Sequence, residues 1–407
     1  MNILTKYLLT NQLYFMKNKF SILLIAFIGL ASLSYSQSGN ADKKFGINWS
    51  GFVKSDFMYD TRQVVNAREG HFNILPTSVN MVNGEDINDQ ANFNILAIQS
   101  RLKGAITGPD FFGMKTSGVI EAAFFGNSDG STGEFRLRHA FVKLSNENLE
   151  ILMGQYWHPM FVTAVFPGVY SFNTGVPFQP FSRNPQLRIT TKGTVKFIGV
   201  LFTERDFKTR GASVSQSGIP QVHAQLQFGK ATETLGGVGF NFKNSRPQLG
   251  EDNLTSTAFI GYFRTKLGDA TWKAEVTYGQ NMTDVLQVGG FGLANGDYVN
   301  NNTLSIWTEF QGDFSETMEW GLFGGYTKND GFGEAINYVN GFLGSGVESA
   351  FRVSPRIGWK SGNLKIGVEG EFTNAQYGSI DGNGDINTTG VDAVNNFRLL
   401  TTAIYKF

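Results

Sequence analysis

The spacing of its alternating segments restricts the fold of this chain more than any other feature. Sixteen segments alternate apolar with polar residues, and a period of two is the pattern of a β-strand with two different faces. Seven of the fifteen connections between them are short and eight are long, and the two kinds alternate strictly. An antiparallel sheet of consecutive strands accounts for this, because it gathers the short connections at one edge and the long ones at the other. The predicted strands are 46–59, 93–107, 113–125, 134–144, 148–155, 185–192, 194–203, 220–229, 235–243, 254–266, 270–280, 302–311, 316–327, 347–359, 363–374 and 394–407.

The last segment, Phe397–Phe407, shows most clearly what the two faces contact. One face carries Tyr405 and Phe407 among mostly apolar residues, and the other carries Arg398 and Lys406. The aromatic face suits lipid and the charged face suits a wet interior. A terminal Phe with Tyr two positions before it resembles the C-terminal signal that the assembly machinery of outer-membrane barrels reads. A soluble edge strand could alternate in the same way, but it would rarely end a chain on Phe.

The composition agrees with a membrane barrel and excludes several chemistries. Gly is abundant at 49 residues and Phe at 37, as many tight turns and aromatic girdles require. The chain has no Cys, which excludes disulfides, thiolate metal sites and Cys nucleophiles. The first 36 residues carry three of the 34 basic residues and no acid, so the mature chain would hold 31 basic and 34 acidic residues. This balance gives no basic footprint for nucleic acid, and no nucleic-acid partner is expected.

The N-terminus has the three parts of a secretory signal. Two lysines follow Met16, the apolar run Phe20–Leu30 comes next, and Ser36 is the small residue before the expected cut. The run is too short to span a bilayer as a helix, which needs about 20 residues. An N-terminal membrane anchor is the alternative, whereas the absence of Cys excludes a lipoprotein, and Met16 is the better initiator. The expected division is a signal peptide at 1–36, a short periplasmic segment at 37–45 and a barrel at 46–407.

In lipid, the two edge strands of such a sheet must find hydrogen-bond partners. No water is present in a bilayer to satisfy an edge strand, so only a closed barrel leaves no unpaired backbone. An even number of strands puts both termini in the periplasm, with short periplasmic turns and long extracellular loops. Sixteen strands enclose an aqueous channel, whereas eight would be filled by side chains. We therefore expect an all-β fold: a transmembrane, antiparallel, up-and-down β-barrel of about sixteen strands in the lipid of the bacterial outer membrane.

The third long connection, Tyr156–Asn184, is unusually apolar for a loop. It contains four prolines and many aromatic residues, and Arg183 is its first basic side chain other than a histidine. Exposed to water, such a loop would be a large sticky patch. We expect it to fold into the lumen as a rigid constriction. The alternatives are that it packs on a neighbouring subunit or plugs the mouth of the barrel.

Arginines lie around this loop at positions expected to face the lumen. In the strand 134–144, Phe135, Leu137 and Phe141 share one face, and two of the arginines share the other. Guanidinium groups pair with carboxylate or phosphate in a bidentate manner, and a basic wall in a narrow channel would attract anions. The alternative is that each arginine pairs with a lumen acid such as Glu121 or Glu134. The candidate residues are Arg101, Arg136, Arg138, Arg183 and Arg188.

The same region resembles a known family. The run Gly154-Gln155-Tyr156-Trp157, followed by a loop rich in Pro and Gly and then by Arg183–Arg188, is similar to the G-Q-x-W … R-x-P-Q-x-R segment of DcaP-like porins. The resemblance implies a trimeric, sixteen-stranded outer-membrane channel that prefers small anions such as dicarboxylates. It also implies that Arg183 and Arg188 contact solute and that Gln155 and Trp157 frame the loop. With a cut before Gln37, only about ten residues would precede the first strand, so the helical N-terminal extension of some family members is not expected here.

Other motifs in the sequence are weak. Asp381, Asn383 and Asp385 have the spacing of a calcium loop, but Ile386 stands where the sharp turn needs Gly, so a polar turn is the expected structure. The four histidines show no metal-binding spacing, and no G-x-S-x-G nucleophile motif is present. We therefore expect no enzyme activity, no metal and no cofactor.

These expectations favour a passive porin for small hydrophilic solutes, with a preference for anions such as carboxylates or phosphate and a size limit set at the third loop. We expect no plug domain before the barrel and therefore no energy-coupled transport. The alternative is a structural or adhesion barrel, or an accessory subunit of a secretion system, without transport. The first hypothesis implies these partners: membrane lipid, small anionic solutes, the assembly machinery at Phe407, and two further copies in a homotrimer.

Overall fold

The computed structural model describes residues 45–126, 128–207, 214–343 and 346–407. The predicted export signal, 1–36, and the segment 37–44 that follows it lie outside the described residues. Within these ranges, no helix is long and apolar enough to cross a membrane.

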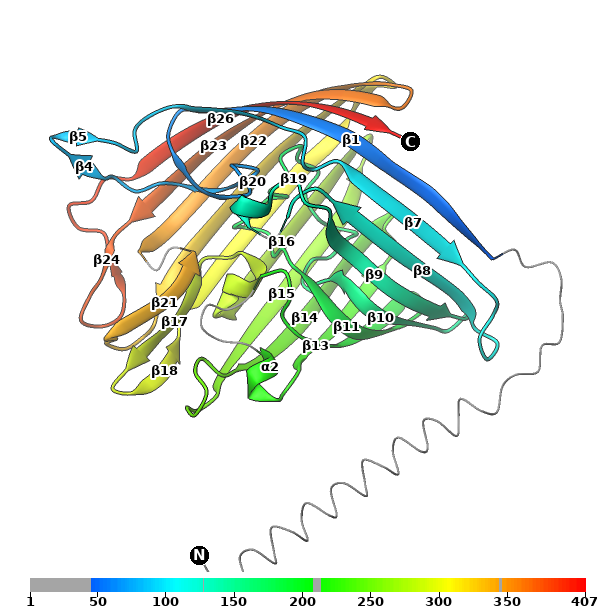
Figure 1. The fold of residues 1–407 in the computed structure, drawn as a ribbon, viewed down its shortest axis with the longest axis horizontal. Coiled ribbons are helices and arrows are strands. Elements are labelled where there is room, and N and C mark those ends of the chain that lie inside the picture. Colours follow the sequence, from blue (N-terminus) through cyan, green and yellow to red (C-terminus); the bar gives the residue numbers. More distant parts are fainter. Residues whose placement is uncertain (1–44, 127, 208–213, 344–345) are drawn as a thin grey trace, which may run out of the picture. The chain divides into compact units, whose positions relative to one another are not determined.

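The wall of the described structure is one antiparallel sheet that closes on itself (Figure 1). Its strands are β1 (Gly46–Asp60), β6 (Asn92–Leu96), β7 (Arg101–Thr107), β8 (Lys115–Ala123), β9 (Arg136–Ser145), β10 (Leu149–Trp157), β11 (Arg183–Thr191), β12 (Val195–Phe202), β13 (Gln221–Gly229), β14 (Thr234–Ser245), β15 (Leu254–Leu267), β16 (Ala270–Gln280), β19 (Asn302–Ser315), β20 (Met318–Gly331), β22 (Val347–Ser361), β23 (Leu364–Tyr377) and β26 (Val394–Lys406). β6 and β7 pair with different halves of β1 and form one interrupted strand, so the wall has sixteen strands. β1 also pairs with β26, which closes the ring. The predicted all-β barrel is confirmed, and each predicted strand overlaps a wall strand.

The connections keep the alternation that the sequence predicts. Short turns join every second pair of neighbouring strands at one end of the barrel, and long loops join the others at the opposite end (Figure 1). By the convention for such barrels, the short turns are periplasmic and the long loops extracellular. The long loops are L1 (61–91), L2 (124–135), L3 (158–182), L4 (203–220), L5 (246–253), L6 (281–301), L7 (332–346) and L8 (378–393).

Short elements lie within the long loops. L1 contains two hairpins, and strands of L6 and L7 form a separate three-stranded sheet in the order β18-β17-β21. Three single helical turns lie in L2, L4 and L6. The elements are β2 (Val64–Ala67), β3 (Phe72–Pro76), β4 (Met81–Val82), β5 (Glu85–Asp86), η1 (Asp129–Ser131), α2 (Val214–Ser217), η2 (Met282–Val285), β17 (Gly289–Ala294), β18 (Asp297–Asn300), β21 (Tyr338–Leu343), β24 (Ser379–Ile380) and β25 (Ile386–Asn387).

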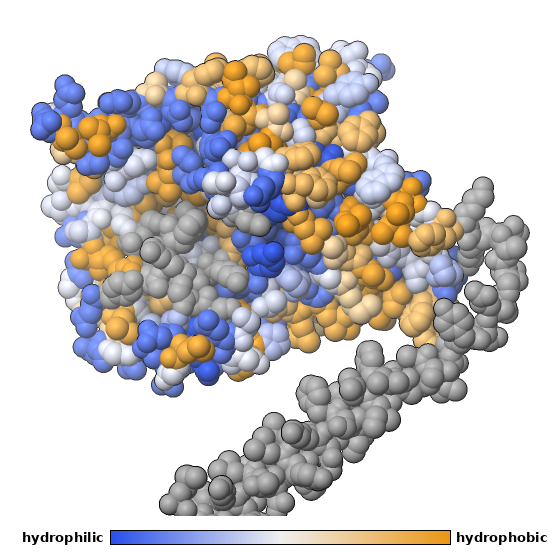
Figure 2. All heavy atoms as spheres, in the orientation of Figure 1, coloured by the Kyte–Doolittle hydropathy of each residue, from blue (hydrophilic) through white to orange (hydrophobic). Residues whose placement is uncertain are grey.

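The two faces of the wall reverse the pattern of a soluble protein. Along β13, the polar residues Gln221, His223 and Gln225 are buried, whereas Val222 is 40% exposed and Leu226 is 49% exposed. Figure 2 shows hydrophobic residues spread over the strand wall and hydrophilic residues gathered at the end that carries β4 and β5. An apolar exterior and a polar interior are what a barrel in lipid requires.

The alternation shifts within β9, which the sequence pattern does not reveal. The pairing of β8 with β9 slips by one residue after Glu121, which makes Arg138 part of a β-bulge. An extra residue moves every side chain that follows it to the opposite face. Val142, which is 52% exposed, therefore lies on the outer face in place of Phe141. The expectation that Phe141 shares the outer face with Phe135 is wrong for this reason.

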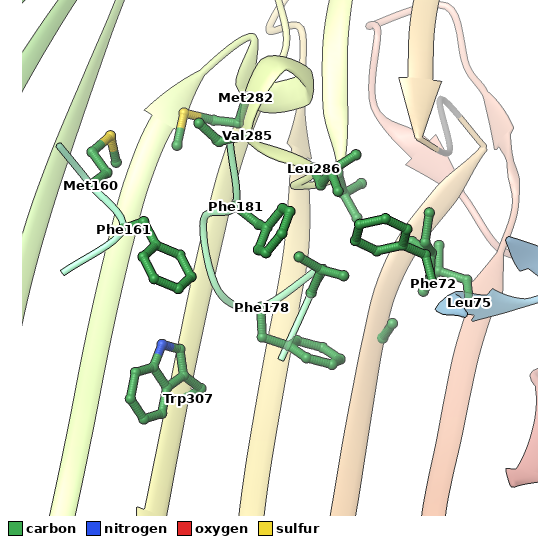
Figure 3. Close-up of a cluster of buried hydrophobic side chains, with 14 of the residues drawn as sticks. Phe72, Leu75, Met160, Phe161, Phe178, Phe181, Met282, Val285, Leu286 and Trp307 are labelled. Atoms are coloured by element: carbon green, nitrogen blue, oxygen red, sulfur yellow. The ribbon is translucent and has the colours of Figure 1, made fainter. Parts of the chain in front are cut away.

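An apolar core lies inside the barrel, built mainly by three loops. Side chains of L1, L3 and L6 pack together and against Trp307 of β19 (Figure 3). Complete burial of one large apolar side chain stabilises a fold by about 1.5–3 kcal/mol, so this core holds the loops firmly in the lumen. The loop residues that Figure 3 labels are Phe72, Leu75, Met160, Phe161, Phe178, Phe181, Met282, Val285 and Leu286.

Candidate functional site

L3 runs through the interior of the barrel, and its backbone bonds to strands far apart in the ring. The N–H of Gly168 donates to both carboxylate oxygens of Glu309 in β19, at 2.8 and 3.0 Å. The N–H of Tyr170 donates to Glu369 in β23 at 2.5 Å, and its carbonyl accepts from Lys54 of β1 at 2.7 Å. A buried peptide group without a hydrogen-bond partner costs free energy. These charged wall residues therefore hold the loop in place and also provide partners for its backbone N–H and C=O groups.

Tyr170 lies where L3 meets the open part of the lumen. Its hydroxyl donates to the carboxylate of Glu319 at 2.7 Å. Burial and the negative charge of Glu319 raise the pKa of Tyr170 above its ordinary value, so the hydroxyl keeps its proton. The cations of Arg356 and Lys365 lie 5.9 and 5.7 Å from the centre of its ring. Tyr170 is thus a fixed aromatic surface with positive charge beside it.

A cavity of about 480 Å³ lies against L3. We call it the vestibule; L3 residues 166–172 line it together with five cationic side chains from the barrel wall. Lys365 and Lys406 lie beside strand ends at the short turns, which places the vestibule on the expected periplasmic side of L3. No Asp or Glu is among the described residues that line it. The five cations are Lys54, Arg101, Arg138, Lys365 and Lys406.

Acids stand behind these cations and do not line the vestibule. Glu121 lies 2.8 Å from Arg138 and 3.4 Å from Arg101. Lys54 pairs with Asp56 at 3.2 Å and Lys365 with Glu319 at 2.6 Å. The side chains of Arg101 and Lys365 remain 21% and 24% exposed, whereas those of Arg138 and Lys54 are almost fully buried. The wall is therefore cationic toward the vestibule, with its counter-charges set back.

The structure separates the five predicted arginines into three groups. Arg101 and Arg138 line the vestibule. Arg136 and Arg183 share the carboxylate of Asp206 in L4, at 2.6 Å from Arg183, and lie outside the vestibule lining. Among the described residues, the acids that pair with these arginines are Glu121 and Asp206, and Glu134 forms no salt bridge with them. The alternative of acid-paired arginines thus describes four of them.

Arg188, the fifth, forms no salt bridge among the described residues and bonds to neutral groups. Its Nε donates to Gln186 at 2.9 Å, its Nη2 donates to the carbonyl of Trp157 at 3.0 Å, and its cation lies 5.1 Å from the ring of Tyr156. These contacts hold Arg188 against the strand that leads into L3.

Gln155 and Trp157 lie in the last residues of β10, directly before L3. The amide of Gln155 donates to the carbonyl of Arg138 at 2.8 Å. Trp157 stacks on Phe161, with ring centroids 4.0 Å apart, and the guanidinium of Arg183 lies 5.2 Å from its ring. Trp157 also lines the vestibule, so the two residues connect the arginine-bearing strands to the loop.

The weak calcium-loop candidate forms a turn. One oxygen of Asp381 accepts the backbone N–H groups of Asn383 at 2.8 Å and Asp385 at 3.1 Å. Within the described part of the chain, no group of three or more His, Cys, Asp or Glu side chains is arranged to hold a metal ion.

Sequence reasoning missed part of the site. It did not predict that L1 and L6 enter the lumen beside L3, and it did not single out Lys54 and Lys365. The alternation carried a signal for both lysines, because each lies on the polar face of its strand. The buried residues of L1 gave only a short apolar run, Phe72–Leu75, broken by Asn73.

Comparison with known proteins gives structural relatives alone. No family model and no curated protein sequence matches the chain. The outer-membrane channel DcaP of Acinetobacter baumannii is similar, with a TM-score of 0.72 at 19% identity over 91% of this chain and 99% of that one. The anion-selective porin of Comamonas acidovorans has a TM-score of 0.57 at 11% identity, over 89% of this chain and 100% of that one.

The outer-membrane protein OmpT of Vibrio cholerae has a TM-score of 0.55 at 10% identity, over 92% of this chain and 100% of that one. At such low identity, these likenesses show the fold. The predicted resemblance to DcaP-like porins is confirmed at that level. The fold, together with the apolar outer face of the wall, places the chain in the bacterial outer membrane.

Proposed function

We propose that this barrel, which has the fold of outer-membrane porins, is a passive channel for small hydrophilic solutes and that it favours anions. The observation that carries the proposal is the vestibule: five cationic side chains line it, and no carboxylate does so among the described residues. A narrow cavity with walls of one charge concentrates counter-ions of the other. Carboxylates and phosphate are therefore the solute groups that this site fits.

The partly exposed cations suggest how an anion would move. Arg101 and Lys365 reach the vestibule while their partners, Glu121 and Glu319, sit behind them. A guanidinium pairs with a carboxylate through two parallel hydrogen bonds, and an ammonium acts as a compact point charge. Partial neutralisation by the acids behind would keep binding weak, as a diffusive channel requires if solute is to leave again.

The size limit would come from L3 together with L1 and L6. L3 bonds to β1, β19 and β23 and shares its apolar core with the other two loops. A loop held at so many points would act as a rigid constriction. Passage would then depend on the cross-section of the solute as well as on its charge.

A homotrimer in lipid is the assembly we propose. On the outer wall, β1, β7, β8 and β9 enclose an apolar hollow of about 300 Å³, lined by Trp49, Leu102, Ile120, Ala122, Phe135 and Leu137. A neighbouring subunit or lipid would cover it. Phe407, 57% exposed and hydrogen-bonded through its backbone to Gly51, remains the proposed contact for the assembly machinery.

Planar-bilayer recording tests the channel. The purified, folded protein should give stable ohmic steps, and in a salt gradient its reversal potential should show anion preference. The double variant Arg101→Gln, Lys365→Gln should move that potential toward zero. Lys230→Gln is the matched control, because it removes the same charge type from an exposed periplasmic turn outside the vestibule.

The outcomes separate the hypotheses. Folded protein without conductance would refute the channel and favour an adhesion or accessory barrel. Conductance with an unchanged reversal potential in the double variant would leave the channel but refute the anion mechanism.

A further inference from the structure

L1 lies beside L3 inside the barrel, although the two loops are about a hundred residues apart in sequence. Phe72 of L1 packs edge-on against Phe172 of L3, with ring centroids 4.7 Å apart. The amide of Asn173 in L3 donates to the carbonyl of Asn73 in L1 at 3.1 Å. The two loops therefore form one inner layer, and whatever joins them to the wall determines the position of both.

One wall residue, Arg352 of β22, bonds to both loops at once. Its Nη1 donates to the carbonyl of Val176 in L3 at 2.9 Å, and its Nη2 donates to the carbonyls of Asn73 and Ile74 in L1 at 2.7 and 3.1 Å. Its Nε donates to Thr373 of the next strand at 2.8 Å, which fixes the plane of the guanidinium.

The surroundings of Arg352 support a holding role. The residue is 1% exposed and is absent from the vestibule lining, so it does not meet solute there. Its cation lies 5.6 Å from the ring of Phe178 in L3. On β26, Arg398 holds L1 in a similar way: it pairs with Asp60 at 2.7 Å and donates to the carbonyl of Gly70 at 2.8 Å.

We propose that Arg352 is a positioning residue that locks L1 to L3 and thereby fixes the aperture of the channel. The planar fork of a guanidinium can serve carbonyls of two loops and a wall hydroxyl in fixed directions, which a lysine ammonium cannot do. If either loop moves, its bonds to Arg352 break. The importance of the lock for permeation rests on the proposed channel function, whereas the loop positions can be measured without it.

The absence of Cys from the sequence allows a direct measurement. Val176→Cys in L3 and Ile74→Cys in L1 place single thiols at buried positions, and Ala123→Cys places one at a buried wall position as a control. Each is combined with native Arg352, with Arg352→Met and with Arg352→Lys, and labelling by a small maleimide is followed in the folded protein. Heat-dependent migration in SDS gels checks that each barrel has folded.

In the Arg352→Met background, we expect the maleimide to label the two loop thiols about tenfold faster, or more, than in the native background. Loss of one charge-assisted hydrogen bond changes an opening equilibrium by roughly that factor. Arg352→Lys should also speed labelling, and it replaces the Met variant if the latter does not fold. The Ala123→Cys control should be unaffected. In bilayers, Arg352→Met should give larger or noisier steps at an unchanged reversal potential, whereas Arg101→Gln should shift the potential without faster labelling.

Loop thiols that stay as slow in both Arg352 variants as in the native background would overturn the lock. Labelling that is slow in Arg352→Lys but fast in Arg352→Met would show that a positive charge alone holds the loops. That result would contradict the proposal that the planar guanidinium is required. Faster labelling in a protein that never conducts would support the lock and refute the channel, so the two failures are distinguishable.

Discussion

Replacement of Glu309 by Gln tests whether L3 is held by buried charge. Glu309 is fully buried in β19, pairs with Lys273 at 2.9 Å and Arg356 at 2.7 Å, and accepts the N–H of Gly168. The amide of Gln is nearly the same size but leaves both cations without their counter-charge. Removal of one partner from a buried ion pair costs about 3–5 kcal/mol, because the remaining charge stays desolvated.

A second ion pair of the same strand provides the control. Asp313 pairs with Lys360 at 2.5 Å, but the two side chains are 60% and 30% exposed. The distance between Asp313 and Lys360 is shorter than the distances in the buried pairs of Glu309. Solvent screening nevertheless limits the contribution of an exposed pair to stability to about 0–1 kcal/mol. Asp313→Asn should therefore cost little, and the contrast isolates burial from distance.

Equilibrium unfolding by guanidinium chloride in detergent micelles, followed by tryptophan fluorescence, measures both variants. The double variant Lys273→Met, Glu309→Gln should lose less stability than the two single changes added together, because it removes one of the stranded cations along with the acid. A loss for Glu309→Gln no larger than that for Asp313→Asn would refute the argument that buried charge anchors L3.

Two further predictions concern the same loop. A Cβ at Gly168 would overlap the side-chain ends of Gln311 and Arg356, which bond to each other and, through Arg356, to Glu309. Gly168→Val should therefore disturb this network beside L3 and change the unitary conductance, whereas a conductance equal to the native value would show that the two side chains move aside without effect on the loop. Burial lowers the pKa of His158, at the base of L3, to about 3, so the unfolded chain binds a proton more readily than the folded one between that value and the ordinary pKa of about 6.5. The contribution of His158 to stability should therefore be complete above pH 6.5 and be lost on acidification at up to about 1.4 kcal/mol per pH unit. His158→Gln should reduce the slope of the unfolding free energy against pH between pH 7 and 4, and an unchanged slope would refute this role.

The fold was largely predictable because a barrel in lipid requires a pattern that is visible among neighbouring residues of each strand. Alternation along Phe397–Phe407 and the alternating connection lengths depend only on neighbouring residues, and both appear in the structure. The bulge at Arg138 was not predictable, because it lies in the pairing of two strands and not in the pattern of either. This one extra residue moves Phe141 from the expected outer face to the opposite face.

The site was less predictable, because its contacts join distant segments. Arg136 and Arg138 have equivalent positions in the sequence pattern. In the structure, however, Arg136 pairs with Asp206 of L4 and Arg138 lines the vestibule. The pairing depends on where Asp206, some seventy residues away, returns to the wall. Likewise, nothing local to Arg352 indicates that it bonds to two loops.

The charge of the vestibule lining depends on which wall residues remain open to the cavity once L3 is in place. Three lumen glutamates, Glu309, Glu369 and Glu371, accept hydrogen bonds from the backbone or an amide side chain of L3. The carbonyls of L3 in turn accept from wall cations, among them Lys54, Lys273 and Arg352, so the backbone of L3 bonds to charges of both signs. The three glutamates lie outside the vestibule lining, whereas Lys54 both bonds to L3 and lines the cavity. A chain of zero net charge can thus present a cationic lining, and the anion preference that we propose would depend on the path of L3 rather than on composition.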